Sequence, residues 1–194
     1  MCWTIGVDEA GRGPLAGPVA VGVFAIPNEF DMTLLTGIRD SKKLSERQRE
    51  SWHARISNMT GALWSVALVD AAHIDSFGIV DAIRTATSRA LEDLNLDPSQ
   101  CEVLLDGGLL APDAYHKQTT IIRGDVTEPA ISAAAIMAKV ARDRYMCTQS
   151  EQYPLYGFQT HKGYGTSLHV EAIRSHGLSM LHRVSFCRRL LTSQ

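Results

Sequence analysis

The sequence predicts a single α/β domain built around a mixed β-sheet. Short runs rich in valine, isoleucine and leucine, typical of buried strands, alternate with longer segments whose apolar residues recur at helical spacing. Of the 194 residues, 45% are apolar, which is enough for one core with a small appendage. The expected strands cover residues 3–7, 19–26, 62–69, 103–105 and 119–122, and the main expected helices cover residues 45–57, 79–94 and 129–147.

The first expected strand stops at two adjacent acids, Asp8 and Glu9, which are followed by Gly11, Arg12 and Gly13. Adjacent carboxylates repel each other unless they share a proton or a cation, and hard divalent metals are the usual cation. Glycine lets the backbone approach a ligand closely, and the forked guanidinium of arginine suits phosphate. An incidental polar turn is the alternative for the two acids alone, but the attached tripeptide makes it the weaker one.

The helix expected over residues 45–57 has a recognisable start. Ser45 and Gln48 have the spacing of a capping box. The segment before it contains Lys42 and Lys43, which taken alone would be a solvated charge pair. Because they lie just ahead of a helix, the two lysines could also hold a phosphate.

The helix expected over residues 79–94 has an apolar stripe, and Asp97-Pro98 marks its end. Two more expected strands then stop at an acid beside a glycine, at Asp106-Gly107 and Gly124-Asp125. Acids often follow strands simply because loops are polar, so one such residue would mean little. Strand ends of a mixed sheet meet at one edge, however, where ligands bind. If these acids converge with the first pair, the four carboxylates can hold two divalent ions about 4 Å apart, an arrangement that cleaves phosphodiester bonds.

An alanine-rich helix is expected to open at Pro129, because proline is tolerated in a first turn. Asp125 lies close to its start, where the helix dipole favours an anion. Three basic residues, Lys139, Arg142 and Arg144, place positive charge on this helix. For at least one of them we expect an ordinary solvated position.

Residues 153–166 read as a loop that mixes aromatic, glycine and basic residues, among them Tyr164. This composition suits stacking on sugars or bases while phosphates are held. The alternative is a linker that packs its aromatic rings on the core. Thr166 can cap a last helix that ends near His176-Gly177.

Charge and cysteine content limit the classes of protein. The net charge of −2 gives no global basic field, so any site for a polyanion must be a local patch. The four scattered cysteines form no Cys-x-x-Cys pair, so we expect neither a zinc site nor a disulfide framework. We expect their thiols to be reduced, as in a cytosol. We see no signal peptide and no apolar run long enough to span a bilayer, and therefore expect a cytoplasmic protein with no membrane partner.

Taken together, these motifs resemble those of ribonuclease HII, the bacterial form of type 2 ribonuclease H, over nearly the full length of the chain. The motifs are so specific that a match to all of them by chance is not credible. The matching segments are Val7–Val19, Asp40–Leu44, Leu105–Gly107, Gly124–Asp125, Ala138–Val140 with Arg142–Asp143, His161–Thr166, and His182–Arg183 with Ser185–Phe186.

The resemblance implies an RNase H-like fold, a mixed five-stranded sheet flanked by helices, with a small helical C-terminal part. Residues 1–150 would form the catalytic domain, and residues 151–194 a helical substrate-binding segment that does not fold on its own. The implied activity is endonucleolytic cleavage of RNA in RNA–DNA hybrids and cleavage 5′ to a single ribonucleotide in duplex DNA, as in ribonucleotide excision repair. The products would carry 5′-phosphate and 3′-hydroxyl ends.

The resemblance also assigns roles to residues. Gly11, Arg12 and Gly13 match the motif that reads the ribonucleotide 2′-hydroxyl and the RNA–DNA junction, and Tyr164 matches the tyrosine that packs on the junction sugar. Mg²⁺ or Mn²⁺ suits all-oxygen ligands. With substrate bound we expect two ions, one activating water and one stabilising the leaving 3′-oxygen. The family's four metal-binding, catalytic acids are matched by Asp8, Glu9, Asp106 and Asp125.

The sequence departs from the family pattern at Ala135, where serine is usual, at Gly78, where asparagine is common, and over residues 177–181. We expect these differences to affect helix stability and the substrate groove and not the chemistry. The partners implied are RNA–DNA hybrid and ribonucleotide-containing duplex DNA, and we expect a monomer. Because Asp8 lies so near the start, the extra N-terminal domain of the sister family, ribonuclease HIII, is not expected.

Two other functions are open to the same residues. One is a non-catalytic nucleic-acid-binding module on the same fold, for which the loss of an acid would be the signature, and all four acids are present. The other is a metal-dependent phosphatase acting on small esters, which would not need Gly-Arg-Gly together with an aromatic, basic loop.

Overall fold

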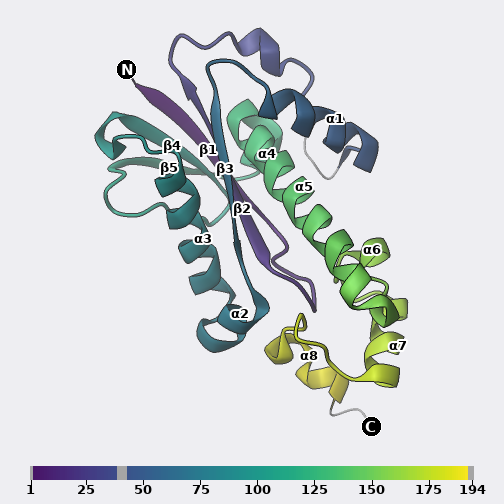
Figure 1. Ribbon diagram of the computed structural model, residues 1–194. Coiled ribbons are helices and arrows are strands. Elements are labelled where there is room, and N and C mark those ends of the chain that lie inside the picture. Colours follow the sequence, from purple (N-terminus) through teal and green to yellow (C-terminus); the bar gives the residue numbers. More distant parts are fainter. Residues whose placement is uncertain (1, 39–42, 192–194) are drawn as a thin grey trace.

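The computed structural model describes residues 2–38 and 43–191, and within them five strands form one mixed sheet in the order β3-β2-β1-β4-β5 (Figure 1). β1 pairs antiparallel with β2, and β2 with β3, whereas β4 pairs in parallel with both β1 and β5. The mixed five-stranded sheet is therefore confirmed. The strands are β1 (Trp3–Ala10), β2 (Val19–Pro27), β3 (Leu63–Val69), β4 (Cys101–Asp106) and β5 (Lys117–Ile121).

Helices flank the sheet and form the C-terminal part of the chain (Figure 1). α1 (Glu46–Ser57) and α5 (Pro129–Gln152) belong to one side, and α2 (Ala71–Phe77) and α3 (Ile79–Asp93) to the other. Across the described ranges, none of the helices is long and apolar enough to cross a membrane. The shorter helices are α4 (Gly124–Thr127), α6 (Phe158–His161), α7 (Ser167–His176) and α8 (Val184–Leu191), with 3-10 turns at Met32–Leu35, Pro98–Gln100 and Pro154–Tyr156.

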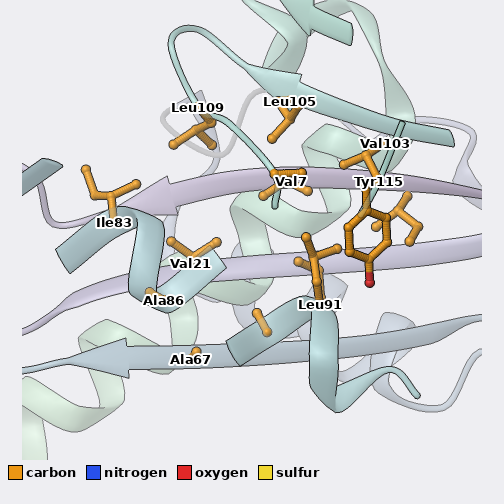
Figure 2. Packing of buried hydrophobic residues seen from close by; sticks show 14 of the residues in the cluster. Val7, Val21, Ala67, Ile83, Ala86, Leu91, Val103, Leu105, Leu109 and Tyr115 are labelled. Atoms are coloured by element: carbon orange, nitrogen blue, oxygen red, sulfur yellow. The ribbon is translucent and has the colours of Figure 1, made fainter. Parts of the chain in front are cut away.

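One face of the sheet forms the main core with α3. Successive side chains of a strand point to opposite faces, so every second residue of a strand enters this core. Val7 of β1 and Leu105 of β4 are fully buried there, against Ile83 and Leu91 of α3 (Figure 2). The apolar stripe that predicted a helix from residue 79 is thus the surface that covers the sheet.

The other face is covered by α5 at very short range. A Cβ atom built on Gly22 of β2 would lie 2.3 Å from the carbonyl oxygen of Ala134, and one on Gly6 of β1 would lie 2.2 Å from the carbonyl carbon of Ala130. Glycines on the strands and alanines on the helix therefore allow this close approach. The close approach also fixes the distance between α5 and the edge of the sheet where Asp8 and Asp106 lie.

The C-terminal segment packs on the end of α5. A small cluster joins Met146 of α5, Ala16 of the loop after β1, and Tyr156 and Phe158. α5 itself continues to Gln152, past the domain boundary expected at residue 150 and past the helix end expected at residue 147. Residues 148–152 are polar, so the apolar pattern gave no sign of the last turn. The division into domain and segment stays a prediction.

Local capping signals are confirmed. The Ser45 side chain accepts from the Gln48 N–H, and the Gln48 side chain accepts from the Ser45 N–H, which completes the capping box of α1. Thr166 caps α7 by accepting from the N–H of His169 at 3.3 Å. Both signals depend only on residues within one turn of each other.

Three acids lie inside strands and not after them, contrary to expectation. β1 continues to Ala10 because residues 8–10 pair with residues 20–22 of β2. Asp106 is the last residue of β4 and pairs with Ile121. Acids are poor strand formers, so the apolar pattern ended each strand too early, and pairing with neighbouring strands overrides that preference.

Four helices, α2, α4, α6 and α8, were not expected at these residues, and α6 lies within residues 153–166, which were expected to form a loop. α2 has a local signal, because Asp70 accepts from the N–H of His73 at 2.9 Å. α8 has a distant one, because Asp75 accepts from the N–H groups of Val184 and Ser185 at 2.7 and 2.9 Å. A cap supplied from 109 residues away cannot be read from the local sequence.

We predict that Gly22→Ala lowers the free energy of unfolding by about 3 kcal/mol, or the melting temperature by roughly 6–12 °C for a chain of this size. The added methyl group would overlap the α5 backbone, which cannot move aside without displacing the whole helix. Thermal unfolding followed by circular dichroism measures the effect. Gly108→Ala is the control, since a Cβ there meets no atom within 4 Å. Equal losses in the two variants would contradict this account of the packing.

Candidate active site

The register of β1 and β4 brings two acids to the same level of the sheet. The strands are parallel, with Val7 opposite Leu105, so Asp8 and Asp106 follow side by side. Since Val7 and Leu105 point into the α3 core, the two acids lie on the face covered by α5. Asp125 joins them from α4, and its N–H donates to Asp106 Oδ1 at 3.3 Å.

The three carboxylates form a compact group. Asp8, Asp106 and Asp125 each offer one oxygen, and these oxygens all lie within 4.8 Å of one another. Asp8 and Asp125 are buried, and Asp106 is half-buried. Burial, followed by the charges of Glu9, Asp106 and Asp125, raises the pKa of the Asp8 carboxyl well above its ordinary value. A divalent cation would relieve this repulsion, and an all-carboxylate set of donors fits Mg²⁺ or Mn²⁺.

Glu9 does not belong to this group of three. Neighbouring side chains of a strand point to opposite faces, so Glu9 is directed away from Asp8. Its Oε1 atom lies 3.4 Å from Nη1 of Arg12. Glu9 nevertheless lines the same pocket as Asp8.

A pocket of about 230 Å³ opens beside the acids. It brings together the Gly-Arg-Gly tripeptide and Tyr164, two motifs that are about 150 residues apart in the sequence and were predicted to contact the same substrate. Ala135 of α5, one of the departures from the family pattern, lies in the pocket wall. The lining residues are Asp8, Glu9, Ala10, Gly11, Arg12, Gly13, Asp106, Ala135, Lys139 and Tyr164.

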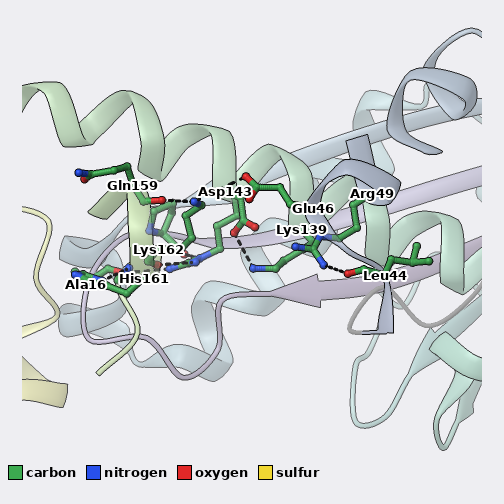
Figure 3. Close-up of polar contacts among 12 residues, drawn as sticks. Ala16, Leu44, Glu46, Arg49, Lys139, Asp143, Gln159, His161 and Lys162 are labelled. Atoms are coloured by element: carbon green, nitrogen blue, oxygen red, sulfur yellow. Dashed lines mark hydrogen bonds and ion pairs between the residues drawn. The ribbon is translucent and has the colours of Figure 1, made fainter. Parts of the chain in front are cut away.

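Tyr164 is the aromatic wall of the pocket. Its side chain is partly exposed, and its ring centroid lies 5.7 Å from Lys139 Nζ and 5.7 Å from Arg142 Cζ. Lys139 also forms an ion pair with Asp143 at 2.7 Å, one turn along α5 (Figure 3). The ring is therefore bordered by two cations, and part of it stays exposed.

Arg183, directly before α8, fixes the loop that follows β1. It is fully buried, and its three donors bind main-chain carbonyls: Nε to Gly17 at 3.0 Å, Nη1 to Arg12 at 3.1 Å and Nη2 to Gly11 at 2.7 Å. Burial lowers the pKa of the guanidinium to about 9, so it remains charged near neutral pH. A charged donor pointed at three carbonyls is a strong constraint on the loop.

Arg142 of α5 holds the next part of the same loop. It is also fully buried, and it donates to the carbonyls of Pro18, Ala16 and Lys162 at 2.9, 3.1 and 3.0 Å. Lys162 precedes Gly163 and Tyr164 in the sequence, so Arg142 joins the loop after β1 to the segment that carries the aromatic wall. Arg142 thus carries its positive charge into the core and does not lie on a solvated face of α5.

The reason for glycine at position 11 differs from the one expected. Its φ is +90°, and a Cβ there would lie 2.0 Å from Nε of Arg142. Gly11 therefore makes room for a buried guanidinium, and its close approach to a ligand stays a prediction. Gly13, by contrast, borders open space in the pocket, and a Cβ added to it would meet no atom within 4 Å.

Two other predicted basic residues, Lys43 and Arg144, do not line the pocket. Lys42 lies outside the described residues, as does most of the segment before it, and Lys43 is exposed just ahead of α1. Arg144 forms an exposed ion pair with Glu50 of α1 at 2.5 Å, an ordinary surface position. The phosphate role of the two lysines stays a prediction.

Several residues that shape the site were not predicted as site residues. Ser132 donates to the carbonyl of Asp125 at 2.8 Å and so fixes the short helix that carries this acid. Lys139 lies in the pocket although it is far from the acids in sequence. Arg183 was noted only as part of a motif. Lys139 and Ser132 both lie on α5, so helical spacing from Pro129 was the signal that could have placed them on the face that meets the sheet.

Comparison with known proteins gives one consistent family. The family model described as Ribonuclease HII matches residues 5–189. Ribonuclease HII of Caldicellulosiruptor bescii is 41% identical over 187 residues, which cover 96% of this chain and 87% of that protein. Ribonuclease HII of Coxiella burnetii, strain Dugway 5J108-111, is 44% identical over 181 residues, which cover 93% of this chain and 86% of that protein.

A solved structure has the same fold. The chain is similar to one in the complex of PCNA with RNase HII from Archaeoglobus fulgidus, with a TM-score of 0.75, 24% identity, and 93% of each chain covered. At this identity the likeness concerns the fold alone. The RNase H-like fold expected from the sequence is confirmed.

We predict that Asp8→Asn raises the melting temperature in metal-free buffer near neutral pH. The raised pKa means that the charged carboxylate costs folding stability above that pKa, and asparagine keeps the shape without the charge. We expect a gain of roughly 2–4 °C, equivalent to about 1 kcal/mol. Added Mn²⁺ or Mg²⁺ should raise the melting temperature of the wild type more than that of the variant. Glu102→Gln, at an exposed acid of β4, is the control. An equal metal-induced rise in Asp8→Asn would exclude Asp8 as a ligand.

We predict that Arg183→Lys lowers the free energy of unfolding by about 3 kcal/mol, because one ammonium cannot replace a fork directed at three carbonyls. The loop should also lose its fixed position, and nuclease activity should fall with it. Urea unfolding and a cleavage assay measure the two effects. Arg174→Lys on the exposed side of α7 is the matched control. Wild-type stability of Arg183→Lys would show that the guanidinium bonds do not hold the loop.

Proposed function

Because the chain belongs to the ribonuclease HII family of divalent-metal-dependent endonucleases, we propose that it cleaves the RNA strand of RNA–DNA hybrids and cuts 5′ to single ribonucleotides in duplex DNA. The products would carry 5′-phosphate and 3′-hydroxyl ends. One observation carries the proposal: a single pocket combines Asp8 and Asp106 of the acidic group, the Gly-Arg-Gly tripeptide and the exposed ring of Tyr164. This combination suits a substrate that has both a phosphodiester and a sugar to be recognised.

The acids are proposed to hold the metal. Asp8, Asp106 and Asp125 would bind a divalent ion directly, Glu9 would complete the set from the pocket edge, and a second ion would enter with the substrate. Bound divalent ions supply an activated water and neutralise charge on the phosphate and the leaving oxygen. Either Mg²⁺ or Mn²⁺ suits these ligands. A relative with the same fold, Bst-RNase HIII, has been solved in complex with Mn²⁺, with a TM-score of 0.77, 18% identity, and 98% of this chain and 69% of that chain covered.

The loop is proposed to read the 2′-hydroxyl through its main chain. In a trans peptide the carbonyl and the following N–H point in opposite directions. The carbonyls of Gly11 and Arg12 are turned to the buried Arg183, so the N–H groups of Arg12 and Gly13 are turned away from it. Two donors fixed in this way can meet a sugar hydroxyl, the group that distinguishes RNA from DNA. The Arg12 side chain, which is more than half exposed, is free to reach a phosphate from its contact with Glu9.

The remaining roles follow from position and chemistry. Tyr164 would pack on the sugar at the junction, Lys42 and Lys43 would contact phosphates, and residues 151–194 would extend the duplex-binding surface. We also infer that the protein works as a cytoplasmic monomer in ribonucleotide excision repair. The thiols of all four cysteines are free, which agrees with a reducing compartment.

A panel of substrates tests the proposal. We predict cleavage at the 5′ side of one ribonucleotide in a DNA duplex and along an RNA–DNA hybrid, with no cleavage of all-DNA duplex and no hydrolysis of a chromogenic phosphate ester. Product size on a sequencing gel gives the position of the cut, and Asp106→Asn provides the inactive control. Hydrolysis of the small ester alone would indicate a phosphatase, and binding without any cleavage would indicate a non-catalytic module.

We predict that Tyr164→Ala slows cleavage at an isolated ribonucleotide more than cleavage of a long hybrid. Only one 2′-hydroxyl fixes the register in the first substrate, whereas neighbouring sugars help in the second. Loss of the ring corresponds to roughly 1–3 kcal/mol, by analogy with base–aromatic stacking. Single-turnover rates on both substrates measure the difference, with Tyr153→Ala as a control ring outside the pocket lining. Equal losses on both substrates would leave Tyr164 with a packing role only.

A further inference from the structure

Three histidines of the C-terminal segment are buried beside one another and take no part in the acidic pocket. His161, His169 and His182 are 7%, 0% and 3% exposed. The rings of His161 and His169 stack with centroids 4.3 Å apart, and those of His169 and His182 lie 5.2 Å apart. Phe158 packs against all three rings. Three titratable rings in a core need either charges that are compensated or hydrogen atoms in fixed places.

Hydrogen-bond directions assign the hydrogen atoms of two of these rings. The N–H of Ser179 donates to Nδ1 of His182 at 2.8 Å, so the hydrogen of a neutral His182 ring is on Nε2. That Nε2 faces Nε2 of His169 at 3.1 Å, which must therefore accept. The hydrogen of His169 is then on Nδ1, which donates to the carbonyl of Tyr164 at 2.9 Å.

The result is a directed chain from Ser179 through two neutral imidazoles to the main chain of Tyr164. Burial, with a smaller contribution from neighbouring imidazoles, lowers the pKa of both His169 and His182 to about 4. A charged ring at either position would place two N–H groups opposite each other. Both rings are therefore neutral near neutral pH, and each hydrogen bond of the chain keeps one donor and one acceptor.

The Tyr164 main chain is fixed on both sides of its exposed ring. Its N–H donates to the carbonyl of His161 at 2.9 Å, and its carbonyl accepts from Thr166 at 2.8 Å as well as from His169. The residue before it, Gly163, accepts from the N–H groups of Leu15 and Ala16 in the loop after β1. The ring itself is partly exposed, and the cations of α5 lie 5.7 Å from its centroid. Its place at the pocket is thus set by its backbone.

We propose that His169 and His182 are positioning residues that hold the Tyr164 backbone, and through it the ring, at the edge of the acidic pocket where a ribonucleotide sugar would bind. The proposal deepens the function proposed above and rests on the sugar-packing role of Tyr164. A tyrosine ring displaced by a small distance would still fill space but would no longer match one sugar. The neutral histidine chain supplies this precision without adding charge to a site that binds a polyanion.

Two substitutions at position 169 separate positioning from packing. Asparagine can place its amide N–H where Nδ1 of histidine lies, whereas glutamine reaches toward the Nε2 position and leaves the Tyr164 carbonyl without this donor. We expect His169→Gln to slow cleavage at a single ribonucleotide by about tenfold, the equivalent of one lost hydrogen bond, and to slow cleavage of a long hybrid much less. His169→Asn should restore the ratio of the two rates. His116→Gln, at an exposed histidine, is the control.

A second measurement does not depend on activity. Nitrogen-15 NMR of the imidazole rings distinguishes the two neutral tautomers, and we expect the hydrogen on Nδ1 in His169 and on Nε2 in His182 near neutral pH. A wild-type protein with His169 charged, or with its hydrogen on Nε2, would overturn the proposal even if the substituted proteins fail to fold. A normal substrate preference in Tyr164→Ala would overturn the ring's role and the functional part of this proposal together. A changed preference in Tyr164→Ala with an unchanged one in His169→Gln would overturn the positioning alone.

Discussion

The active-site edge of this protein depends on two buried guanidinium groups. Arg142 and Arg183 direct six donors at main-chain carbonyls, and five of these belong to residues 11–18. That loop leaves the sheet after Ala10 and returns to it at Val19, so the strand ladder does not satisfy its carbonyls. Without the arginines the loop would need water or a different path, and the pocket would lose one wall. The sixth carbonyl, of Lys162, extends the same constraint to the segment that carries Tyr164.

The pocket wall opposite this loop is formed by α5 and depends on the packing of the helix against the sheet. The close approach of α5 to Gly6 and Gly22 places Ala135 and Lys139 beside the acids. The same sheet places Asp8 next to Asp106, through the parallel register of β1 and β4, at a cost in stability that the raised pKa of Asp8 reports. The rigid scaffold thus holds carboxylates together that would separate if they were free to move. A cation that binds to such a site would stabilise the folded protein, because it offsets the repulsion between the carboxylates.

Much of this arrangement could be predicted from local patterns. Apolar runs located the strands, the Ser45 capping box located α1, and acids near strand ends indicated which carboxylates come together. The direction of Glu9 could have been read from strand alternation, but only once β1 was known to continue through it. The burial of Arg142 could not, because a basic residue on a helix is usually solvated and its partners here lie 124 and 126 residues away. The tautomers of His169 and His182 depend in the same way on contacts made only in the folded chain.

The long reach of Arg183 has a consequence for the order in which the molecule is assembled. Its donors meet carbonyls of residues made 166 to 172 positions earlier. Contacts of such separation close late in folding, and chains are synthesised from the N-terminus. The growing chain therefore possesses Asp8 and Glu9 long before it possesses the residue that holds the neighbouring loop in place. Until the C-terminal segment docks, such a nascent chain has the acids that are proposed to bind metal without the fixed loop that is proposed to read the substrate. On that proposal, selectivity is acquired only with the last helices.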